Sequence, residues 1–161
     1  MITIHRPEFS QQGEYARIQS LVDIDGSRNV VWFEVRREYG KYLCWERSDA
    51  FVIGLLSYAM RNGHDITCEA PLGEDLHYQI TTYLVKAIAK GDARMYHTRI
   101  MAAVDHNELP CGNAVGTGIS CGIDSFHALA GNNDAKYLKH RITHLTFNNV
   151  GSHGEGASAV C

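Results

Sequence analysis

Apolar and polar residues alternate along residues 29–37, and this alternation is the first clear pattern in the chain. Val31, Phe33 and Val35 fall on one face of an extended segment, which predicts a strand. The pair Tyr39-Gly40 follows, and residues 41–46 (KYLCWE) are again largely apolar and aromatic. A glycine-containing turn between two such runs favours a hairpin, so we expect a second strand there.

Residues 47–63 (RSDAFVIGLLSYAMRNG) change to a helical spacing. Ser48 or Asp49 can cap the N-terminus, because their side chains accept hydrogen bonds from unpaired backbone N–H groups. Asn62-Gly63 can end the helix, because glycine adopts the left-handed conformation at low cost. The helical period places four residues on the expected inner face: Phe51, Leu55, Tyr58 and Ala59.

A second helix is expected over residues 73–91. Glu74 and Asp75 occupy its first turn, where the helix dipole favours negative charge, and Gly91 ends it. Residues 64–70 and 99–104 favour short strands on either side, so residues 1–109 predict a small N-terminal α+β unit. The predicted apolar stripe of this helix consists of Leu76, Ile80, Leu84 and Ala87.

The polar segment 105–113 (DHNELPCGN) contains proline and glycine and is the best candidate for a boundary. After it the pattern predicts a strand over 114–119, a helix over 123–129, a turn over 131–134 and a strand over 142–150. This order is typical of a βαβ unit in a parallel sheet, so the fold class is α/β. One βαβ unit cannot cover both faces of its sheet. We therefore expect residues 110–161 to be the truncated start of a larger domain, in a chain that is a piece of a longer protein.

The composition is that of a globular chain of 161 residues, with 45% hydrophobic and 20% charged residues. The net charge of −3 gives no general electrostatic attraction to nucleic acid. Five cysteines without a CxxC pair argue against a disulfide framework or a zinc site, and reduced thiols favour a cytoplasmic location. The first residues lack the apolar core of a signal peptide, and no apolar run is long enough to span a bilayer.

Candidate chemistry concentrates in residues 118–125 (GISCGIDS), between the predicted strand and helix of the second unit. A loop of small residues that opens a helix aims backbone N–H groups at one point, and the helix dipole favours an anion there. The segment has neither the Gly-Lys-Ser/Thr of a Walker A loop nor a complete GxGxxG. It also matches GxSxG, with Ser120 as a nucleophile between Gly118 and Gly122.

The GxSxG interpretation needs an acid and a histidine to activate Ser120. The available residues are Asp124, Asp134, His140, His144 and His153. α/β-Hydrolases place these partners after further strands, and a nucleophile elbow leaves residues 123–126 (IDSF) unexplained. A third interpretation is a glycine-rich turn with a structural role only.

Residues 120–125 (SCGIDS) resemble the SGGxDS signature of the PP-loop, or N-type, ATP pyrophosphatases, which are similar in fold to the adenine-nucleotide α-hydrolases. That family includes GMP synthetase, asparagine synthetase, NAD synthetase and enzymes that modify tRNA or deazapurines. The resemblance covers residues 114–154, with a strand before the motif, a helix after it and a second strand. It implies a Rossmann-like parallel sheet that binds ATP with Mg²⁺. Such enzymes transfer AMP to a carbonyl or carboxylate oxygen with release of pyrophosphate, and a nitrogen or sulfur nucleophile then displaces AMP.

The resemblance also implies roles for individual residues. Ser120, Gly122 and Ser125 would hold the pyrophosphate end of ATP, helped by the backbone N–H groups of 121–125. Asp124 would brace the loop or lie near the magnesium ion, as the catalytic residue. The end of the second strand would lie near adenine. The implied nucleotide-contacting residues are Ser120, Cys121, Gly122, Ile123, Asp124, Ser125, Phe147 and Asn149.

Cys121 departs from the family pattern, because it stands at the position of the first glycine. If the backbone there has a positive φ, a side chain costs about 1 kcal/mol. A cysteine at a helix start is also a candidate reactive thiol, although a packing role is the simpler interpretation. The acceptor that the resemblance implies is a small molecule or an RNA base. The competing class is non-enzymatic, an inactive remnant or an interaction module.

Three smaller features complete the picture. His140 and His144 would lie about 13 Å apart on a strand at about 3.3 Å per residue, too far to share one metal ion. Residues 148–156 (NNVGSHGEG) follow the second strand, at the edge where open α/β sheets bind ligands, and are interpreted as a nucleotide contact or a solvated tail. An unpaired edge beyond that strand favours a homo-oligomer.

Overall fold

The computed structural model describes residues 1–109, 114–133 and 141–147. They belong to two compact units, an N-terminal unit (Met1–Glu108) and a C-terminal unit (Leu109–Cys161). The chain is mixed α/β, and its strands pair in both parallel and antiparallel directions. The described part of the chain contains no helix with the length and apolar character needed to cross a membrane.

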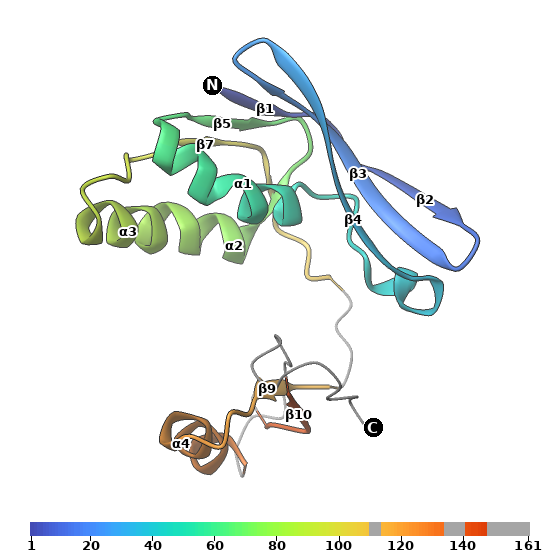
Figure 1. The fold of residues 1–161 in the computed structure, drawn as a ribbon, viewed down its shortest axis with the longest axis vertical. Helices are drawn as coiled ribbons and strands as arrows, with labels where there is room; N and C mark the ends of the chain where they lie inside the picture. Colours follow the sequence, from blue (N-terminus) through green and yellow to red (C-terminus); the bar gives the residue numbers. More distant parts are fainter. Residues whose placement is uncertain (110–113, 134–140, 148–161) are drawn as a thin grey trace, which may run out of the picture. The chain divides into compact units, whose positions relative to one another are not determined.

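A six-stranded sheet is the framework of the N-terminal unit (Figure 1). Five of its strands are ordered β2-β3-β1-β5-β7, and β4 pairs with the other side of β3 along its whole length. Strands β1, β5 and β7 run parallel, whereas β2, β3 and β4 form an antiparallel ribbon. The strands are β1 (Ile2–Ile4), β2 (Glu8–Gln12), β3 (Tyr15–Ile24), β4 (Ser27–Arg36), β5 (Ile66–Cys68) and β7 (Ile100–Met101).

The β3–β4 hairpin turns through two residues, Asp25 and Gly26, which have φ angles of 49° and 85°. Positive φ at both central residues is the geometry of a type I′ turn, whose twist matches that of the flanking strands. The prediction of a strand over 29–37 is confirmed by β4. No strand was predicted before it, so β1, β2 and β3 are elements that only the structure shows.

The predicted continuation of the hairpin over 41–46 is wrong. Residues Arg37–Tyr42 form a short 3₁₀ helix, η1, instead of a turn and a returning strand. The reason is a tertiary contact, because Gly40 is buried against β3. A Cβ atom at Gly40 would lie 2.6 Å from Cβ of Ala16, so only glycine allows the chain to cross β3 this closely.

Helix α1 (Asp49–Asn62) confirms the helix predicted over 47–63, and Gly63 follows it with a φ of 66°. Ser48 is at the N-cap position, but the predicted side-chain cap is wrong, because Ser48 Oγ donates to the carbonyl of Ala70 and makes no capping bond. Its inner face is partly different from the expected one. Phe51 and Ala59 are fully buried, whereas Tyr58 is 46% exposed. The buried face is completed by Val52, Leu56 and Met60.

The predicted second helix is continuous but contains a π-helical turn. It consists of α2 (Glu74–Gln79), the π turn η2 (Ile80–Leu84) and α3 (Val85–Gly91). A π turn contains one more residue than an α turn, so the inner face after it moves by about one position. Ile80 is buried as predicted, but Leu84 is 43% exposed and Val85 is buried in its place. The predicted stripe is therefore correct at Leu76 and at Ile80, the first residue of the π turn. It is wrong at Leu84, the last residue of the π turn, and at Ala87, which is also exposed.

The core of the N-terminal unit lies between the sheet and the two helical segments, which lie on the same side of β1, β5 and β7 (Figure 1). The predicted strand over 64–70 is confirmed by β5. The prediction over 99–104 is confirmed in part, because β7 ends at Met101 and a separate strand β8 (Val104–Asp105) pairs with β6 (Leu72–Gly73). The fully buried side chains include Ile2, Ile4, Val22, Phe51, Met60, Ile66 and Leu72.

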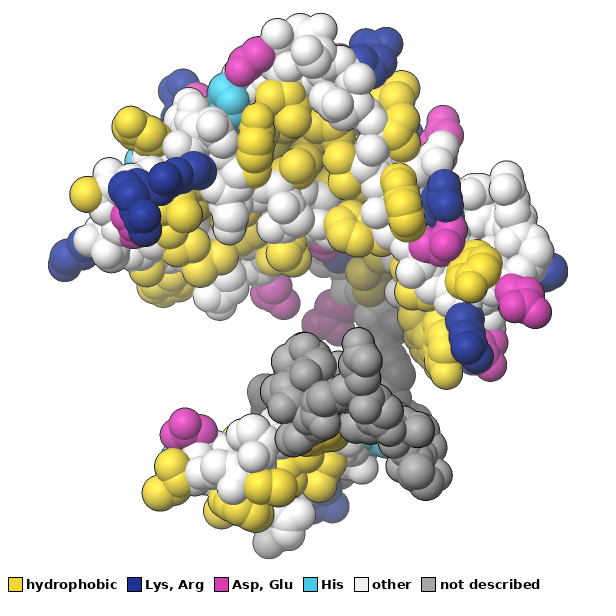
Figure 2. Space-filling model, in the orientation of Figure 1, with side chains coloured by type: hydrophobic (Ala, Val, Ile, Leu, Met, Phe, Trp, Pro, Cys, Tyr) yellow, Lys and Arg dark blue, Asp and Glu magenta, His cyan; other side chains and the backbone are white. Residues whose placement is uncertain are grey.

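The C-terminal unit has the predicted order of strand, loop, helix and strand. These elements are β9 (Gly116–Gly118), α4 (Ile123–Asn132) and β10 (His144–Thr146), and the two strands pair in parallel. The helix extends through part of the predicted turn, since Gly131 and Asn132 are helical, and Asp134 lies outside the described residues. None of the described residues of this unit is buried, and apolar side chains cover much of its visible surface (Figure 2). The exposed ones include Ile123, Phe126, Leu145 and Phe147.

Candidate phosphate-binding loop

The loop 119–122 connects the carboxyl end of β9 to the start of α4. Ile119, the first residue of the loop, is held in place because its backbone N–H donates to the carbonyl of Thr146 over 2.9 Å. Gly118 is opposite Thr146 in the parallel register, so the residues after both strands leave the sheet at the same edge. The loop and Phe147 therefore lie at the carboxyl edge of this two-stranded sheet, where ligands bind in open α/β sheets.

Ser120 and Ser125 hold the loop against the first turn of α4. The backbone N–H of Ser120 donates to Oγ of Ser125 over 3.1 Å, and the two hydroxyl groups share a hydrogen bond of 3.1 Å. One of the two hydroxyl hydrogens is used in that shared bond, so the other remains for an outside acceptor. The backbone N–H of Ser120 is therefore used within the loop, and it precedes the N–H groups of 121–125 that were expected to help hold the phosphates.

Cys121 has a φ of 59°, a left-handed conformation that is rare for residues other than glycine. A positive φ is the condition under which a side chain at this position is costly, and Cys121 meets it. The signature glycine that the PP-loop motif has here is the residue that adopts this backbone without strain. Cys121 is exposed, and it is a free thiol, as are Cys44 and Cys68.

Gly122 is the N-cap of α4 and has no side chain with which to cap the helix. The first intrahelical bond at this end is donated by Phe126 to the carbonyl of Gly122, over 3.2 Å. Backbone N–H groups in the turn before it have no intrahelical acceptor in an α-helix. Ile123 is 84% exposed and Asp124 is exposed in the same turn, so this helix end is open to solvent.

The eight residues implied by the resemblance are not equally tested. Six of them, 120–125, form one continuous loop and helix start. Phe147 follows β10 at the same edge and is 59% exposed. Asn149 lies outside the described residues, as does the loop 148–156.

The GxSxG interpretation has less support from the geometry. A nucleophile elbow puts its strain on the serine, whereas the left-handed residue is Cys121. The Oγ of Ser120 is bonded to another serine rather than to an imidazole. His144 is bonded through Nδ1 to the hydroxyl of its neighbour Thr143. Asp134, His140 and His153 lie outside the described residues. The predicted distance between His140 and His144 is therefore not tested.

A magnesium ion would meet an oxygen ligand at Asp124, whose carboxylate is exposed in the first turn of α4. The described residues contain no group of three acidic, histidine or cysteine side chains that could enclose a metal. Mg²⁺ is commonly held by one or two carboxylates together with substrate phosphates, so a single aspartate fits that type of site.

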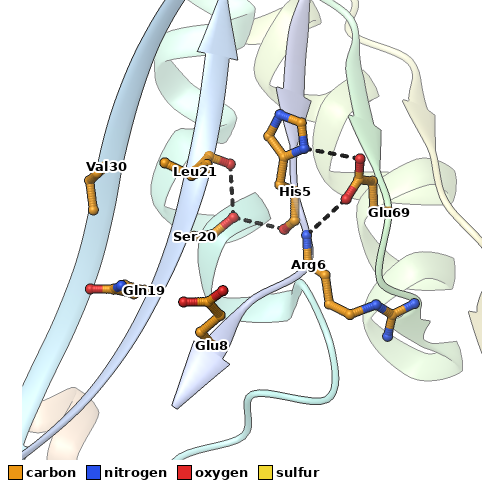
Figure 3. Close-up of a pocket in the computed structure, with 8 residues that line it drawn as sticks. All are labelled: His5, Arg6, Glu8, Gln19, Ser20, Leu21, Val30 and Glu69. Carbon is orange, nitrogen blue, oxygen red and sulfur yellow. Dashed lines mark hydrogen bonds and ion pairs between the residues drawn. The ribbon is translucent and has the colours of Figure 1, made fainter. Parts of the chain in front are cut away.

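A concave site that was not predicted from the sequence lies in the N-terminal unit (Figure 3). It has a volume of about 370 Å³ and lies where β1 and β5 end. His5 follows β1 and Glu69 follows β5, and His5 Nδ1 is 2.9 Å from Glu69 Oε1. The other ring nitrogen of His5 is 2.7 Å from Asp23 Oδ2. These residues are too far apart in sequence for any local motif to have revealed the contact.

The charges around His5 shift its titration. The hydrogen bond to Asp23, assisted by Glu69, raises the pKa of His5 above its ordinary value of 6.5. The hydrogen bond from Arg28 lowers the pKa of Asp23 well below its ordinary range, and the bond from His5 contributes less to the same effect. The raised pKa means that this contact stabilises the fold fully below about pH 6.5 and loses its contribution as the pH rises through the folded-state value. The Asp23 contribution is lost only at strongly acidic pH, as the carboxylate protonates.

Replacing His5 by glutamine should therefore destabilise the protein more at about pH 5.5 than at about pH 8.5. Urea unfolding at the two pH values measures this difference through the transition midpoint. His97→Gln is the matched control, because His97 is an exposed histidine of the same unit. An equal loss at both pH values for His5→Gln would show that the imidazolium contributes nothing.

Comparisons with known proteins identify no relative of this chain. No protein-family model, no curated protein and no solved structure matches it. The resemblance to the PP-loop family therefore depends on the residues and the geometry of the loop alone.

Proposed function

We propose that the C-terminal unit binds the triphosphate of ATP at the loop 120–125, as the beginning of a Rossmann-like, PP-loop type domain. The observation that carries the proposal is the left-handed backbone of Cys121 immediately before the uncapped start of α4. This places a glycine-type conformation at the position where the SGGxDS signature has glycine. Parallel pairing of β9 with β10 supports it, because the loop then lies at the carboxyl edge of the sheet.

Different groups of the loop would interact with the phosphates in different ways. The backbone N–H groups at the start of α4 and the helix dipole favour the negative charge. The Ser120–Ser125 pair offers its remaining hydroxyl hydrogen to a phosphate oxygen. Gly122 leaves the approach to the helix end without a side chain. Phe147 and Asn149 are proposed to lie near adenine.

Asp124 is the proposed ligand of Mg²⁺, and the ion would neutralise charge on the phosphates when it is bound. In the proposed reaction, an oxygen of the acceptor forms a bond to the α-phosphorus of ATP, and the bond from that phosphorus to pyrophosphate breaks. A nitrogen or sulfur nucleophile then displaces AMP from the activated acceptor. The chain contributes positioning of the phosphates and stabilisation of the leaving pyrophosphate.

The proposal includes an acceptor that is a small molecule or an RNA base, and a cytoplasmic location. It also includes the remaining layers of the ATP-binding domain, because the described part of the C-terminal unit has no buried residue. The N-terminal unit would recognise the acceptor or another subunit.

Cys121→Gly should bind ATP with Mg²⁺ about fivefold more tightly than the natural chain, which corresponds to about 1 kcal/mol. Glycine removes the Cβ atom and lets a phosphate approach the backbone. Cys121→Ala is the matched control, because it removes the thiol but keeps Cβ, and it should bind ATP like the natural chain. Isothermal titration calorimetry with ATP and Mg²⁺ measures all three.

The absence of heat for both the natural chain and Cys121→Gly at millimolar ATP would contradict the proposal. It would favour the second candidate function, a non-enzymatic interaction module, which the exposed apolar side chains Ile123 and Phe126 support. Labelling of Ser120 by a fluorophosphonate would instead favour the serine hydrolase.

A further inference from the structure

Strand β4 is a long outer strand with one unpaired side. It pairs with β3 through ten consecutive residues, from Ser27 opposite Ile24 to Arg36 opposite Tyr15. In the part of the chain that the structure describes, β3 is its only strand partner. Outer strands of natural proteins are commonly short or interrupted by proline, lysine or a bulge. β4 contains no proline or lysine, and its register with β3 is uninterrupted.

The turn geometry determines which backbone groups of β4 face the unpaired side. In a two-residue hairpin the residues next to the turn, Ile24 and Ser27, form a hydrogen-bonded pair. Hydrogen-bonded pairs then recur at every second residue, so the odd-numbered residues of β4 bond to β3. The N–H and C=O groups of the even-numbered residues 28–36 therefore point to the unpaired side.

We propose that a second copy of this chain pairs with β4, antiparallel and related by a twofold axis at Val31, so that the two sheets become one. The hydrogen-bonded pairs across this junction would be Arg28 with the partner's Glu34, and Val30 with the partner's Trp32. Each pair occurs twice by symmetry. Val31 would face the partner's Val31 in the non-hydrogen-bonded position on the axis.

Charge complementarity selects this occupant. Within one chain, Arg28 is bonded to Asp23 at 2.8 Å and Glu34 to Arg17 at 2.7 Å, each across the β3–β4 register. Pairing at Val31 extends both bonds into a row of alternating charge across four strands: Asp23, Arg28, the partner's Glu34 and the partner's Arg17. Opposite charges directly across two strands stabilise the pairing.

The apolar residues on the same face also match. Val30 is 55% exposed and Trp32 is 51% exposed, and they would cover each other across the junction. Aromatic and β-branched side chains form favourable cross-strand pairs. Arg17 already stacks on Trp32, with Cζ 4.4 Å from the ring centroid, so the indole is held in place. At the right of Figure 2, over the β2–β3–β4 ribbon, apolar side chains lie among charged ones of both signs.

Other antiparallel registers of β4 with itself are less favourable. Moving the axis to Trp32 puts Arg28 opposite the partner's Arg36, and like charges across a pair are destabilising. Moving it to Val30 puts Glu34 opposite the partner's Gly26 and removes the salt bridge. Only the axis at Val31 gives two charge pairs and two apolar pairs together.

Replacing Val30 by proline tests the proposal in the full chain. Proline removes an N–H that faces the unpaired side, so the pairing with β3 is retained while the junction loses two donors. The natural chain and the isosteric control Val30→Thr should sediment as a dimer, twice the 17.9 kDa of the chain. Val30→Pro should sediment as a monomer with an unchanged circular dichroism spectrum. A natural chain that is monomeric up to its solubility limit would overturn the proposal, as would a Val30→Pro dimer.

A cross-link tests the register and does not depend on how proline affects folding. Val31→Cys puts two thiols at the non-hydrogen-bonded position, where the Cα atoms are about 4.5 Å apart, close enough for a disulfide. Oxidation should give a covalent dimer beyond the background of the natural chain. Ser27→Cys should not, because its two copies would lie eight residues apart, about 26 Å at about 3.3 Å per residue. Equal cross-linking of both variants, or of neither, would overturn the register.

Discussion

Phe51→Ala should destabilise the N-terminal unit by about 3–5 kcal/mol. Phe51 is fully buried in the first turn of α1, and its ring packs edge-to-face on Phe33 of β4 at a centroid distance of 5.4 Å. Truncation to alanine removes this contact between helix and sheet and leaves a cavity that the regular strand β4 cannot easily fill. This loss is a large part of the free energy of unfolding of a typical domain, which is about 5–15 kcal/mol.

Tryptophan fluorescence during urea unfolding measures this loss for the N-terminal unit alone. The chain has two tryptophans, Trp32 and Trp45, and both belong to that unit. Ile53→Ala is the matched control, because Ile53 is on the same helix and is 58% exposed, and it should change the stability by less than about 0.5 kcal/mol. Similar losses for the two variants would mean that α1 does not pack on the sheet through Phe51.

Arg47→Met should destabilise the same unit by about 3 kcal/mol, the second largest effect we expect. The Arg47 side chain is 7% exposed and makes a salt bridge of 2.8 Å to Asp105, at the end of β8. It also donates a hydrogen bond to the carbonyl of Asn107. Methionine keeps the apolar stem but leaves the Asp105 carboxylate beside an uncharged side chain, in a region that is only partly open to water.

The double variant Arg47→Met with Asp105→Asn separates charge from packing. It should lose less stability than Arg47→Met alone, because no carboxylate without a counter-charge remains. Arg94→Met is the exposed control, since Arg94 makes a similar bond to Asp92 but is 72% exposed, and it should have little effect on unfolding. Equal urea midpoints for the Arg47 and Arg94 variants would contradict the structural role assigned to the buried pair.

Hydrophobic periodicity along the sequence correctly predicted strand β4 and helix α1. Alternation at Val31, Phe33 and Val35 gave β4, and the helical period with Gly63 gave α1. The same rules would have identified β3 and its turn, because Asp25-Gly26 is a strong hairpin signal and Ala16, Ile18, Ser20 and Val22 alternate as buried residues. The sequence therefore contains the signal for β3, although no strand was expected there.

Other features depend on contacts that a local pattern does not contain. Gly40 was interpreted as a hairpin turn because glycine favours turns, but its role is close contact with Ala16, more than twenty positions earlier. The π turn in the second helix moved burial from Leu84 to Val85, and no periodic pattern marks where such a turn occurs.

The candidate loop also combines features that the sequence predicts with features that it does not predict. The order of strand, loop, helix and strand was predictable, and so was the consequence of a left-handed residue at Cys121. The hydrogen bonds between Ser120 and Ser125 were not, because they depend on side-chain rotamers around the turn. They involve the backbone N–H of Ser120, which is not among the N–H groups of 121–125 that were expected to hold the phosphates.

Nuclear magnetic resonance of the ¹⁵N-labelled chain during titration with ATP and Mg²⁺ tests the central claim most directly. The account predicts that the backbone amide signals of Cys121, Gly122 and Ile123 shift progressively and more than those of the N-terminal unit. Cys121→Gly should reach the same end point at lower ATP concentration. Unchanged signals for these three amides at millimolar ATP, or shifts centred on His5 and its neighbours instead, would contradict it.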